Sequence, residues 1–210
     1  VLRPLANATG LPLSLLDGGE RIDLTAVAAF FTKRVIGQHE AVQTIVERIA
    51  MLKAGLNDPA KPLGVFLFAG PTGTGKTELA KAAAEFLFGS AERMIRVDMS
   101  EFGTQESIAK LIGGPYQPEH SDTLINRVRR QPFSVVLLDE FEKAHWSIWD
   151  LCLQLLDEGR LTDHHGQPAD FRNCLTILTT NLGATTHQSS GLGFAPGQGA
   201  YSSDQIMRAL

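Results

Sequence analysis

Apolar residues along the chain form four runs of strand length, and helical segments lie between them. The runs cover residues 64–69, 94–98, 134–138 and 174–178, and the helical segments cover residues 75–88, 105–111, 122–130 and 145–157. Strands that alternate with helices are typical of a parallel sheet with helices on both faces. The pattern therefore predicts one α/β domain.

The segments on either side of these runs have different patterns. Residues 1–34 contain two prolines and a Gly-rich turn, and we interpret them as a lead-in segment with a helix from Leu24 to Arg34. From residue 40 to 56, apolar residues recur every three or four positions, which indicates one face of a helix. Residues 191–199 are interpreted as a surface loop and 203–210 as the start of another helix. We expect the main domain to run over residues 35–210.

The composition is that of an ordinary globular protein and argues against two classes of function. The chain has 210 residues, 43% hydrophobic and 20% charged, with a net charge of -4. This charge gives no general attraction to nucleic acid, and we interpret Arg127, Arg129 and Arg130 as a solvated helix face. The apolar runs are too short to span a membrane. Because the N-terminus lacks Met and a signal peptide, we expect a piece of a longer cytoplasmic protein.

The cysteines, histidines and tryptophans suggest structural roles. Cys152 and Cys174 lie inside apolar runs, which predicts reduced core thiols. His164 and His165 lie in a polar turn without cysteine partners, so we do not expect a metal site there. Two tryptophans three positions apart on a predicted helix are interpreted as packing residues.

A phosphate-binding motif follows the first apolar run. Residues 70–77 read Gly-Pro-Thr-Gly-Thr-Gly-Lys-Thr, between a predicted strand and a predicted helix. Glycines let the backbone N–H groups of such a loop point at phosphate oxygens, and the helix N-terminus adds positive charge. We expect Lys76 to reach the β- and γ-phosphates of ATP or ADP, and Thr77 to hold Mg²⁺. The residues predicted to bind nucleotide here are Pro71, Thr72, Gly73, Thr74, Gly75, Lys76, Thr77 and Glu78.

Two acidic residues end the third apolar run. Residues 135–138 are apolar and lead into Asp139 and Glu140, which places both carboxylates at the carboxyl end of a buried strand, where ligands bind in such sheets. We expect Asp139 to orient Mg²⁺, through water, and Glu140 to act as general base toward the attacking water. The alternative for Glu140 is a carboxylate that only stabilises a helix N-terminus.

Asn181 ends the fourth apolar run, after two threonines. Its amide can hold a water molecule or the γ-phosphate without adding charge, provided that its strand lies beside the strand of Asp139. The alternative is an asparagine that simply ends a strand. The predicted catalytic residues are Glu140, Lys76 and Asn181.

Longer strings of sequence resemble a known family in one collinear order from residue 9 to 210. They are VIGQ (35–38), AGPTGTGKTELAKAAAE (69–85), RVDMSEF (96–102), SVVLLDEFEKAH (134–145), LDEGRLTDHHG (156–166), DFRN (170–173) and TTNLG (179–183). Together they resemble the second nucleotide-binding domain of the Clp family of AAA+ unfoldases and disaggregases.

The resemblance implies a P-loop NTPase fold, the large α/β subdomain of an AAA+ protein. It implies the strand order 5-1-4-3-2, with the fifth strand and a helical lid outside this chain, so that the strand at 64–69 is an edge. Val35 and Ile36 match the segment that packs on adenine. The family forms hexameric rings with ATP between subunits, draws a polypeptide substrate through a central channel, and in some cases works with a peptidase or chaperone partner.

Two departures from the family affect this expectation. The segment that matches the main channel loop, residues 113–120, lacks the family's Gly-Tyr-Val-Gly core. Either Tyr116 substitutes as the aromatic residue that grips substrate, or the loop no longer threads polypeptide. The sequence also stops before the family's trans-acting arginine and lid, so we expect the isolated chain to bind nucleotide weakly and hydrolyse it poorly. Residues 159–166 match a second channel loop.

These features predict the ATP-hydrolysing core of a ring-forming protein unfoldase or disaggregase. One alternative is an assembly ATPase that switches shape with nucleotide but threads nothing. A nucleic-acid motor with the same core is disfavoured by the acidic balance of charge.

Overall fold

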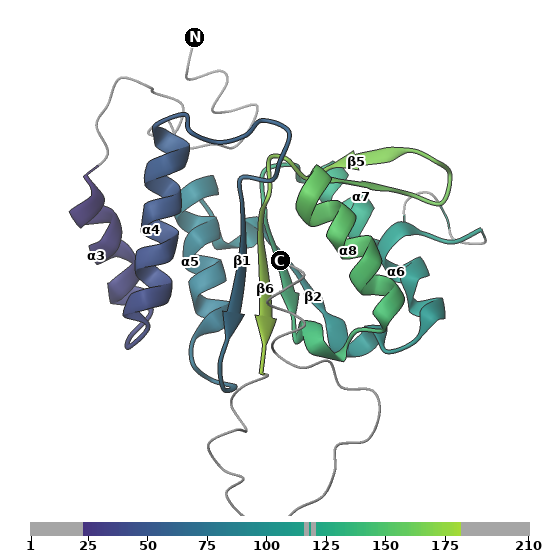
Figure 1. Cartoon of the computed structure of the whole chain (residues 1–210), viewed down its shortest axis with the longest axis horizontal. Helices are drawn as coiled ribbons and strands as arrows, with labels where there is room; N and C mark the ends of the chain where they lie inside the picture. The colour runs from purple at the N-terminus through teal and green to yellow at the C-terminus, as the bar shows by residue number, and fades with distance from the viewer. Residues whose placement is uncertain (1–22, 116–117, 119–120, 182–210) are drawn as a thin grey trace, which may run out of the picture.

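Four parallel strands form a central sheet in the computed structural model, which describes residues 23–115, 118 and 121–181. The strands are β1 (Gly64–Ala69), β2 (Met94–Asp98), β3 (Val135–Asp139) and β6 (Leu175–Thr180). Their order across the sheet is β1-β6-β3-β2 (Figure 1). This order confirms the predicted α/β fold and the relative positions of the four expected strands. Within the described residues, β1 lies at an edge.

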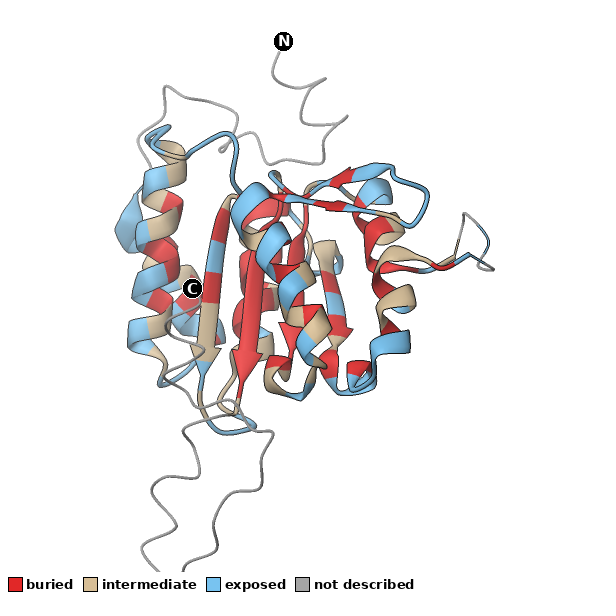
Figure 2. Ribbon diagram, turned by 45° about the vertical axis from the view of Figure 1, so that its right-hand side comes forward, coloured by how far each residue is buried: buried red, intermediate tan, exposed pale blue. Residues whose placement is uncertain are grey.

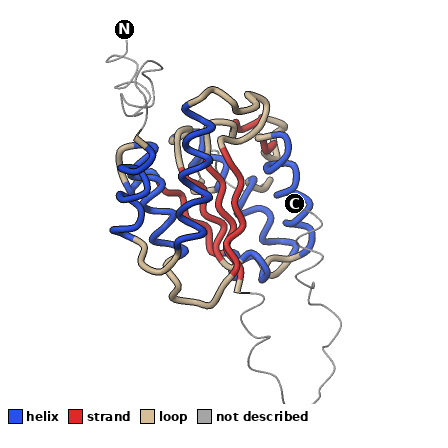
Figure 3. Tube along the Cα trace, turned by 60° about the vertical axis from the view of Figure 1, so that its left-hand side comes forward, coloured by secondary structure: helices blue, strands red, loops and turns tan. Residues whose placement is uncertain are grey.

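Helices cover both faces of this sheet, which gives three layers (Figure 3). One side carries α3 (Leu24–Arg34), α4 (His39–Lys53) and α5 (Lys76–Phe88). The other side carries α6 (Ala109–Ile112), α7 (Leu124–Arg130) and α8 (Trp146–Glu158). Short 3-10 helices occupy Ala91–Arg93, Met99–Phe102, Gln105–Ile108 and Phe141–Lys143.

Strands β3 and β6 lie in the middle of the sheet and are buried along their whole length (Figure 2). Alternate residues of β3 point to opposite faces, as the pleat of a strand requires. Val135 and Leu137 join the core under α5, whereas Val136 and Leu138 join the core under α8. A strand buried on both faces needs apolar residues at every position, which explains the continuous apolar run in the sequence.

Most predicted helices form within one to three residues of their expected ends. The predicted helix at 122–130 begins at Leu124, because the Thr123 hydroxyl caps it by accepting the N–H of Asn126 at 3.3 Å. The predicted helix at 105–111 is instead a 3-10 turn followed by the single turn of α6. No helix in the described part of the chain is long and apolar enough to cross a membrane.

A two-stranded antiparallel hairpin was not predicted. It consists of β4 (Arg160–Thr162) and β5 (Pro168–Asp170). Three residues are too few to show a strand period, so the sequence pattern does not reveal it. Residues 159–166, the predicted second channel loop, comprise β4 and the turn of this hairpin.

Helix α3 packs on α4 and α5 even though it precedes the expected domain start at residue 35. Val27 and Phe31 are buried in the core shared with those helices. At the end of α3, the guanidinium of Arg34 lies 2.7 Å from a carboxylate oxygen of Glu85 and 3.7 Å from the ring centre of Phe30. The boundary at residue 34 stays a prediction.

The two cysteines are buried, and both stay unpaired, as predicted. Burial raises the pKa of Cys152 to about 12, and burial is also the main cause that raises the pKa of Cys174 to about 12. Trp149 packs against Phe141 with ring centres 4.3 Å apart, whereas Trp146 is exposed. Tyr116, the loop at 191–199 and the helix at 203–210 lie outside the described residues.

Candidate nucleotide-binding site

The phosphate loop connects β1 to α5 at the carboxyl edge of the sheet. Gly73 and Gly75 have φ angles of 81° and 91°, a region that residues with a Cβ rarely adopt. Gly75 is the N-cap of α5 and provides no side-chain hydrogen bond to the first turn. The N–H groups at a helix N-terminus have no partner within the helix, so this loop fits an anionic ligand such as phosphate.

Lys76 lies inside the loop, with its ammonium group turned toward the backbone carbonyls. Its Nζ donates to the carbonyl oxygens of Gly70 at 2.6 Å and Pro71 at 2.9 Å, and to Oδ1 of Asn181 at 3.2 Å. Burial lowers the pKa of Lys76, and the nearby carboxylates of Asp139, Glu142 and Glu140 oppose this shift. A bound phosphate would supply further negative charge at the same place.

Asp139 and Glu140 at the end of β3, with Thr179 and Asn181 at the end of β6, form what we call the carboxylate edge. Asp139 is buried, and its Oδ2 accepts hydrogen bonds from Nε and Nη2 of Arg96 at 3.0 and 2.6 Å. Its Oδ1 accepts the hydroxyl of Thr179. Because both oxygens already accept hydrogen bonds, the carboxylate fits a Mg²⁺ ion held through water better than direct coordination.

Glu140 has a φ angle of 56° and is the only non-glycine residue with positive φ in the described segments. Its Oε1 accepts the amide of Asn181 at 3.3 Å, and its Oε2 accepts Nζ of Lys143 at 2.6 Å. Although Glu140 is the N-cap of the following 3-10 helix, its side chain makes no capping hydrogen bond. The geometry therefore does not favour the alternative in which Glu140 only stabilises a helix N-terminus.

Asn181 joins the two parts of the site through one amide group. Its Oδ1 accepts Nζ of Lys76 at 3.2 Å, while its Nδ2 donates to Oε1 of Glu140 at 3.3 Å. The hydroxyl of Thr72 lies 3.4 Å from the same Oδ1. The predicted condition for a role of Asn181 is met, because β6 pairs directly with β3.

The remaining predicted nucleotide contacts differ in position. Val35 is buried, and its Cγ1 would lie 3.5 Å from a Cβ placed on Gly75, so it borders the phosphate loop. Ile36 is 88% exposed. Thr77 is partly buried in the first turn of α5, and Glu78 forms an exposed ion pair with Lys81 at 2.7 Å.

A pocket beside β1 reaches the phosphate loop. Its volume is about 470 Å³, within the usual range for small-molecule sites. Its walls come from the start of α4, the length of β1 and the first turn of α5, including Thr74, Gly75 and Lys76. Gln38, which follows the predicted adenine contacts Val35 and Ile36 in the sequence, also lines this pocket.

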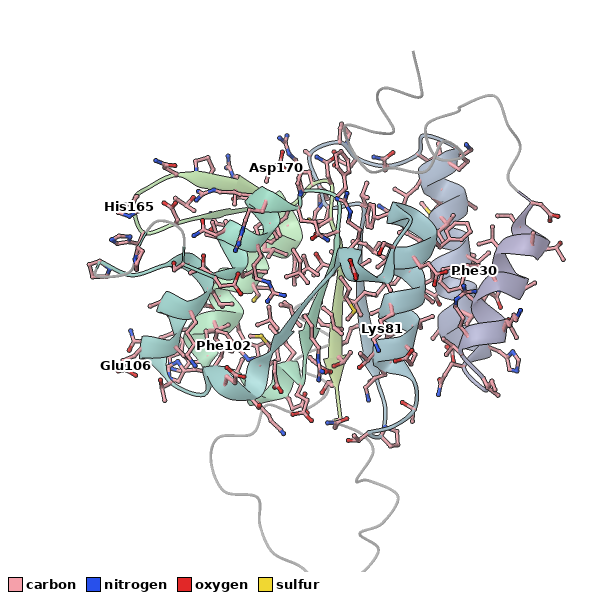
Figure 4. The ribbon with its side chains drawn as sticks, turned by 180° about the vertical axis from the view of Figure 1, so that it is seen from behind. Phe30, Lys81, Phe102, Glu106, His165 and Asp170 are labelled. Carbon is pink, nitrogen blue, oxygen red and sulfur yellow. The ribbon has the colours of Figure 1, made fainter. Side chains whose placement is uncertain are left out.

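Gly113, Gly114 and Pro118, in the described part of the first predicted channel loop, line one pocket together with His164 and His165 of the second. The hairpin lies on the opposite side of the sheet from α5. The N–H of His164 in the hairpin turn donates to the carbonyl of Ile112 at 3.3 Å, directly before the first loop. Nη1 of Arg129 on α7 lies 2.8 Å from Oδ2 of Asp163 in the same turn. His165 in this hairpin turn lies far from Lys81 on α5 (Figure 4).

Four residues of the site were missed by sequence reasoning. Arg96 and Thr179 bind Asp139, Lys143 binds Glu140, and Oε1 of Glu142 accepts the N–H of Asn181 at 3.2 Å. Arg96 carries the one visible signal, a charged residue between apolar neighbours in the middle of a strand. The other three lie within two or three residues of predicted site residues and carry no distinct pattern.

Comparison with known proteins agrees with this geometry, which is that of a P-loop nucleotide-binding domain. The family model of the AAA domain (Cdc48 subfamily) matches residues 61–207, and the chain belongs to this family. It is also 50% identical to the chaperone protein ClpB of Pseudomonas putida over 183 residues, which is 86% of this chain and 21% of that protein. ClpB of Aquifex aeolicus is 51% identical over 187 residues, 88% of this chain and 19% of that protein.

A solved structure supports the same relationship. The closed state of Hsp104 with ATPγS and FITC casein superposes with a TM-score of 0.79 at 36% identity, over 97% of this chain and 35% of that chain. These similarities confirm the predicted resemblance to the Clp family. The chain spans about a fifth of the length of the curated relatives it matches.

Proposed function

We propose that the chain is the ATP-binding and ATP-hydrolysing domain of a ring-forming protein unfoldase or disaggregase. The observation that carries this proposal is the hydrogen-bond chain from Lys76 through Asn181 to Glu140. It places a phosphate-binding ammonium group and a candidate general base on opposite sides of one neutral amide. Such an arrangement suits a γ-phosphate and an attacking water between them.

Each residue has a distinct role in the proposed reaction. The phosphate loop and Lys76 bind and neutralise the phosphates, and Asn181 orients the γ-phosphate. Glu140 accepts a proton from the water whose oxygen attacks the γ-phosphorus, and ADP leaves. Thr77 and Asp139 would hold Mg²⁺, which when bound neutralises charge on the β- and γ-phosphates.

The proposal for the whole protein is supported by its relatives. The ClpB relatives are named chaperones, and the Hsp104 structure contains ATPγS and casein. We therefore propose a polypeptide substrate and a homo-hexameric assembly for the protein that contains this chain. A peptidase or chaperone partner, the absence of a nucleic-acid partner, and a cytoplasmic location stay predictions.

Substitution Glu140→Gln in the full-length protein tests hydrolysis. Glutamine has the shape of glutamate, and its amide oxygen can still accept the hydrogen bond from Asn181. It cannot accept a proton from water, so the substitution removes the base. We expect ATP turnover to fall by about 100-fold or more, while ATP affinity changes by less than about twofold. The matched control is Glu92→Gln, the same change at an exposed residue near the opposite end of β2. Unchanged turnover in Glu140→Gln would remove Glu140 from the mechanism.

A second candidate is an assembly ATPase that hydrolyses ATP without threading polypeptide. The sequence of residues 113–120 favours it, because this loop lacks the channel motif of the family. Substitution Tyr116→Ala in the full-length protein distinguishes the two. If the chain threads substrate through this loop, the rate of substrate unfolding falls while ATP turnover persists. If unfolding continues at the original rate, the gripping role of Tyr116 is wrong.

A further inference from the structure

Thr179 on β6 makes two hydrogen bonds, one to Asp139 at the end of β3 and one to Glu140, the residue after it. Its side chain is fully buried. Its hydroxyl donates to Oδ1 of Asp139 and accepts the backbone N–H of Glu140, with 3.1 Å between nitrogen and oxygen. One hydroxyl group thus contacts the candidate magnesium-orienting carboxylate and the backbone of the candidate base.

We propose that Thr179 is a positioning residue that fixes Asp139 and Glu140 in the geometry needed for hydrolysis. This inference rests on the proposed function, and it assigns a role to a residue outside the two sequence motifs that define the site. Thr179 acts through its neighbours, because its buried hydroxyl already donates to Asp139 and accepts from the backbone of Glu140.

The pairing of the strands explains why a side chain is needed at this point. The register between β3 and β6 runs from Val135 opposite Leu175 to Leu138 opposite Leu178, and ends there. Asp139 is the next residue, and toward β2 it still pairs, with Asp98. On the side of β6, where the pairing of the two backbones has ended, the hydroxyl of Thr179 makes the hydrogen bond that connects Asp139 to β6.

The backbone conformation of Glu140 gives a second reason why the hydroxyl of Thr179 is needed. A positive φ angle is unfavourable for a residue with a Cβ, and it persists only where surrounding contacts hold it. The backbone N–H of Glu140 is held by the hydroxyl of Thr179, and its carboxylate by Asn181 and Lys143. Loss of the hydroxyl would leave this N–H without its acceptor and allow the turn to relax, which moves the carboxylate away from Asn181.

Three substitutions in the full-length protein separate positioning from general support of the fold. Thr179→Val keeps the shape and removes the hydroxyl, whereas Thr179→Ser keeps the hydroxyl. The matched control is Thr176→Val on the same strand, where the hydroxyl is buried and has no hydrogen-bond partner. Removal of an unpaired buried hydroxyl is expected to leave stability unchanged or raised.

We expect Thr179→Val to lower the turnover number for ATP by about 100-fold, the size of effect that a displacement of about 1 Å in a catalytic group can cause. The affinity for ADP, measured by fluorescence titration without Mg²⁺, should change by less than about twofold, because the phosphate loop is untouched. Thr179→Ser should recover turnover to within about threefold of the original protein, and Thr176→Val should match it.

A crystal structure of the 210-residue chain with Thr179→Val gives a readout independent of activity. We expect a negative φ angle at Glu140 and loss of its contact with Asn181. If Glu140 keeps its positive φ and turnover stays normal, the positioning role is wrong. If the valine variant does not fold, Thr179→Ala takes its place, since the smaller side chain leaves room for water at both polar groups. If the unsubstituted protein hydrolyses no ATP, the proposed function fails, while the structure still decides the conformational claim.

Discussion

The phosphate loop obtains its shape from glycines, whereas the carboxylate edge obtains its shape from side chains that reach between strands. Gly73 and Gly75 adopt positive φ angles without a Cβ to oppose them. Glu140 adopts a positive φ angle despite its Cβ, and contacts from β6 and from Lys143 surround it. The loop is therefore encoded locally, while the carboxylate edge depends on the assembled sheet.

This difference also separates two tasks. A loop of backbone N–H groups and one ammonium binds phosphate wherever a strand, turn and helix succeed one another. Orientation of a water molecule against the γ-phosphate needs groups from separate strands at fixed distances. Binding should therefore tolerate changes at the carboxylate edge, and catalysis should not.

The largest expected effect on nucleotide binding comes from Lys76→Ala. The loss of a charge-assisted contact with the phosphates should lower ATP affinity by roughly 10- to 100-fold. Equilibrium titration with a fluorescent ATP analogue measures this. Lys81→Ala, on the exposed face of the same helix, is the control and should bind normally. An unchanged affinity in Lys76→Ala would mean that the phosphate loop is not where nucleotide binds.

Smaller effects are expected on the free energy of unfolding, which Gly75→Ala should lower and Glu140→Asn should leave equal or raise. Gly75→Ala forces a Cβ into a φ angle of 91° and should cost about 1–2 kcal/mol of unfolding free energy. Its Cβ would meet only ordinary contact with Val35, so the cost is conformational.

The partner experiment is Glu140→Asn, because asparagine adopts positive φ more readily than glutamate. We expect the unfolding free energy to stay equal or to rise by up to about 1 kcal/mol, although ATP turnover is lost. Urea unfolding measures both variants. A large loss of stability in Glu140→Asn would show that Glu140 is not strained.

A separate prediction concerns the two buried thiols, Cys152 in α8 and Cys174 directly before β6. Both thiols have a pKa raised to about 12 from 9.0, with burial the main cause. A thiol reagent at pH 8 should not react with the folded chain and should label two cysteines after denaturation.

The same shift has a pH dependence. Each thiol has a higher pKa in the folded chain than in the unfolded chain, so the unfolded chain loses its thiol protons first as the pH rises. The contribution of the two protonated thiols to stability is therefore complete below pH 9 and is lost between pH 9 and 12. The loss should be about 1.4 kcal/mol per pH unit for each thiol. The double variant Cys152→Ala, Cys174→Ala should show a flatter decline over this range. Rapid labelling of the folded chain at pH 8 would show that the two thiols are accessible to the reagent, which would contradict their burial.

The contrast between the two regions also explains what could be predicted from the sequence. Lys76 and the glycines around it follow from one continuous motif, and Asp139 and Glu140 from an apolar run that ends in two acids. The strand order followed from a family resemblance, and it places Asn181 beside Glu140. Arg96, Thr179 and Glu142 could not be assigned, because their roles depend on which residues face one another across β2, β3 and β6.

The hairpin of β4 and β5 shows the same limit on a larger scale. Its strands are three residues each, and among the described residues they pair with one another alone, so neither periodicity nor composition marks them. Its turn has a defined place only in the assembled fold, where the N–H of His164 donates to the end of α6 and Asp163 pairs with Arg129 of α7.

We propose that one amide joins the phosphate loop and the carboxylate edge into a single hydrolytic site. Substitution Asn181→Ala in the full-length protein tests this role, with ATP turnover and ATP affinity measured on the same preparation. We expect turnover to fall by at least about 10-fold while affinity stays within about twofold of the original. Normal turnover in Asn181→Ala would contradict the claim.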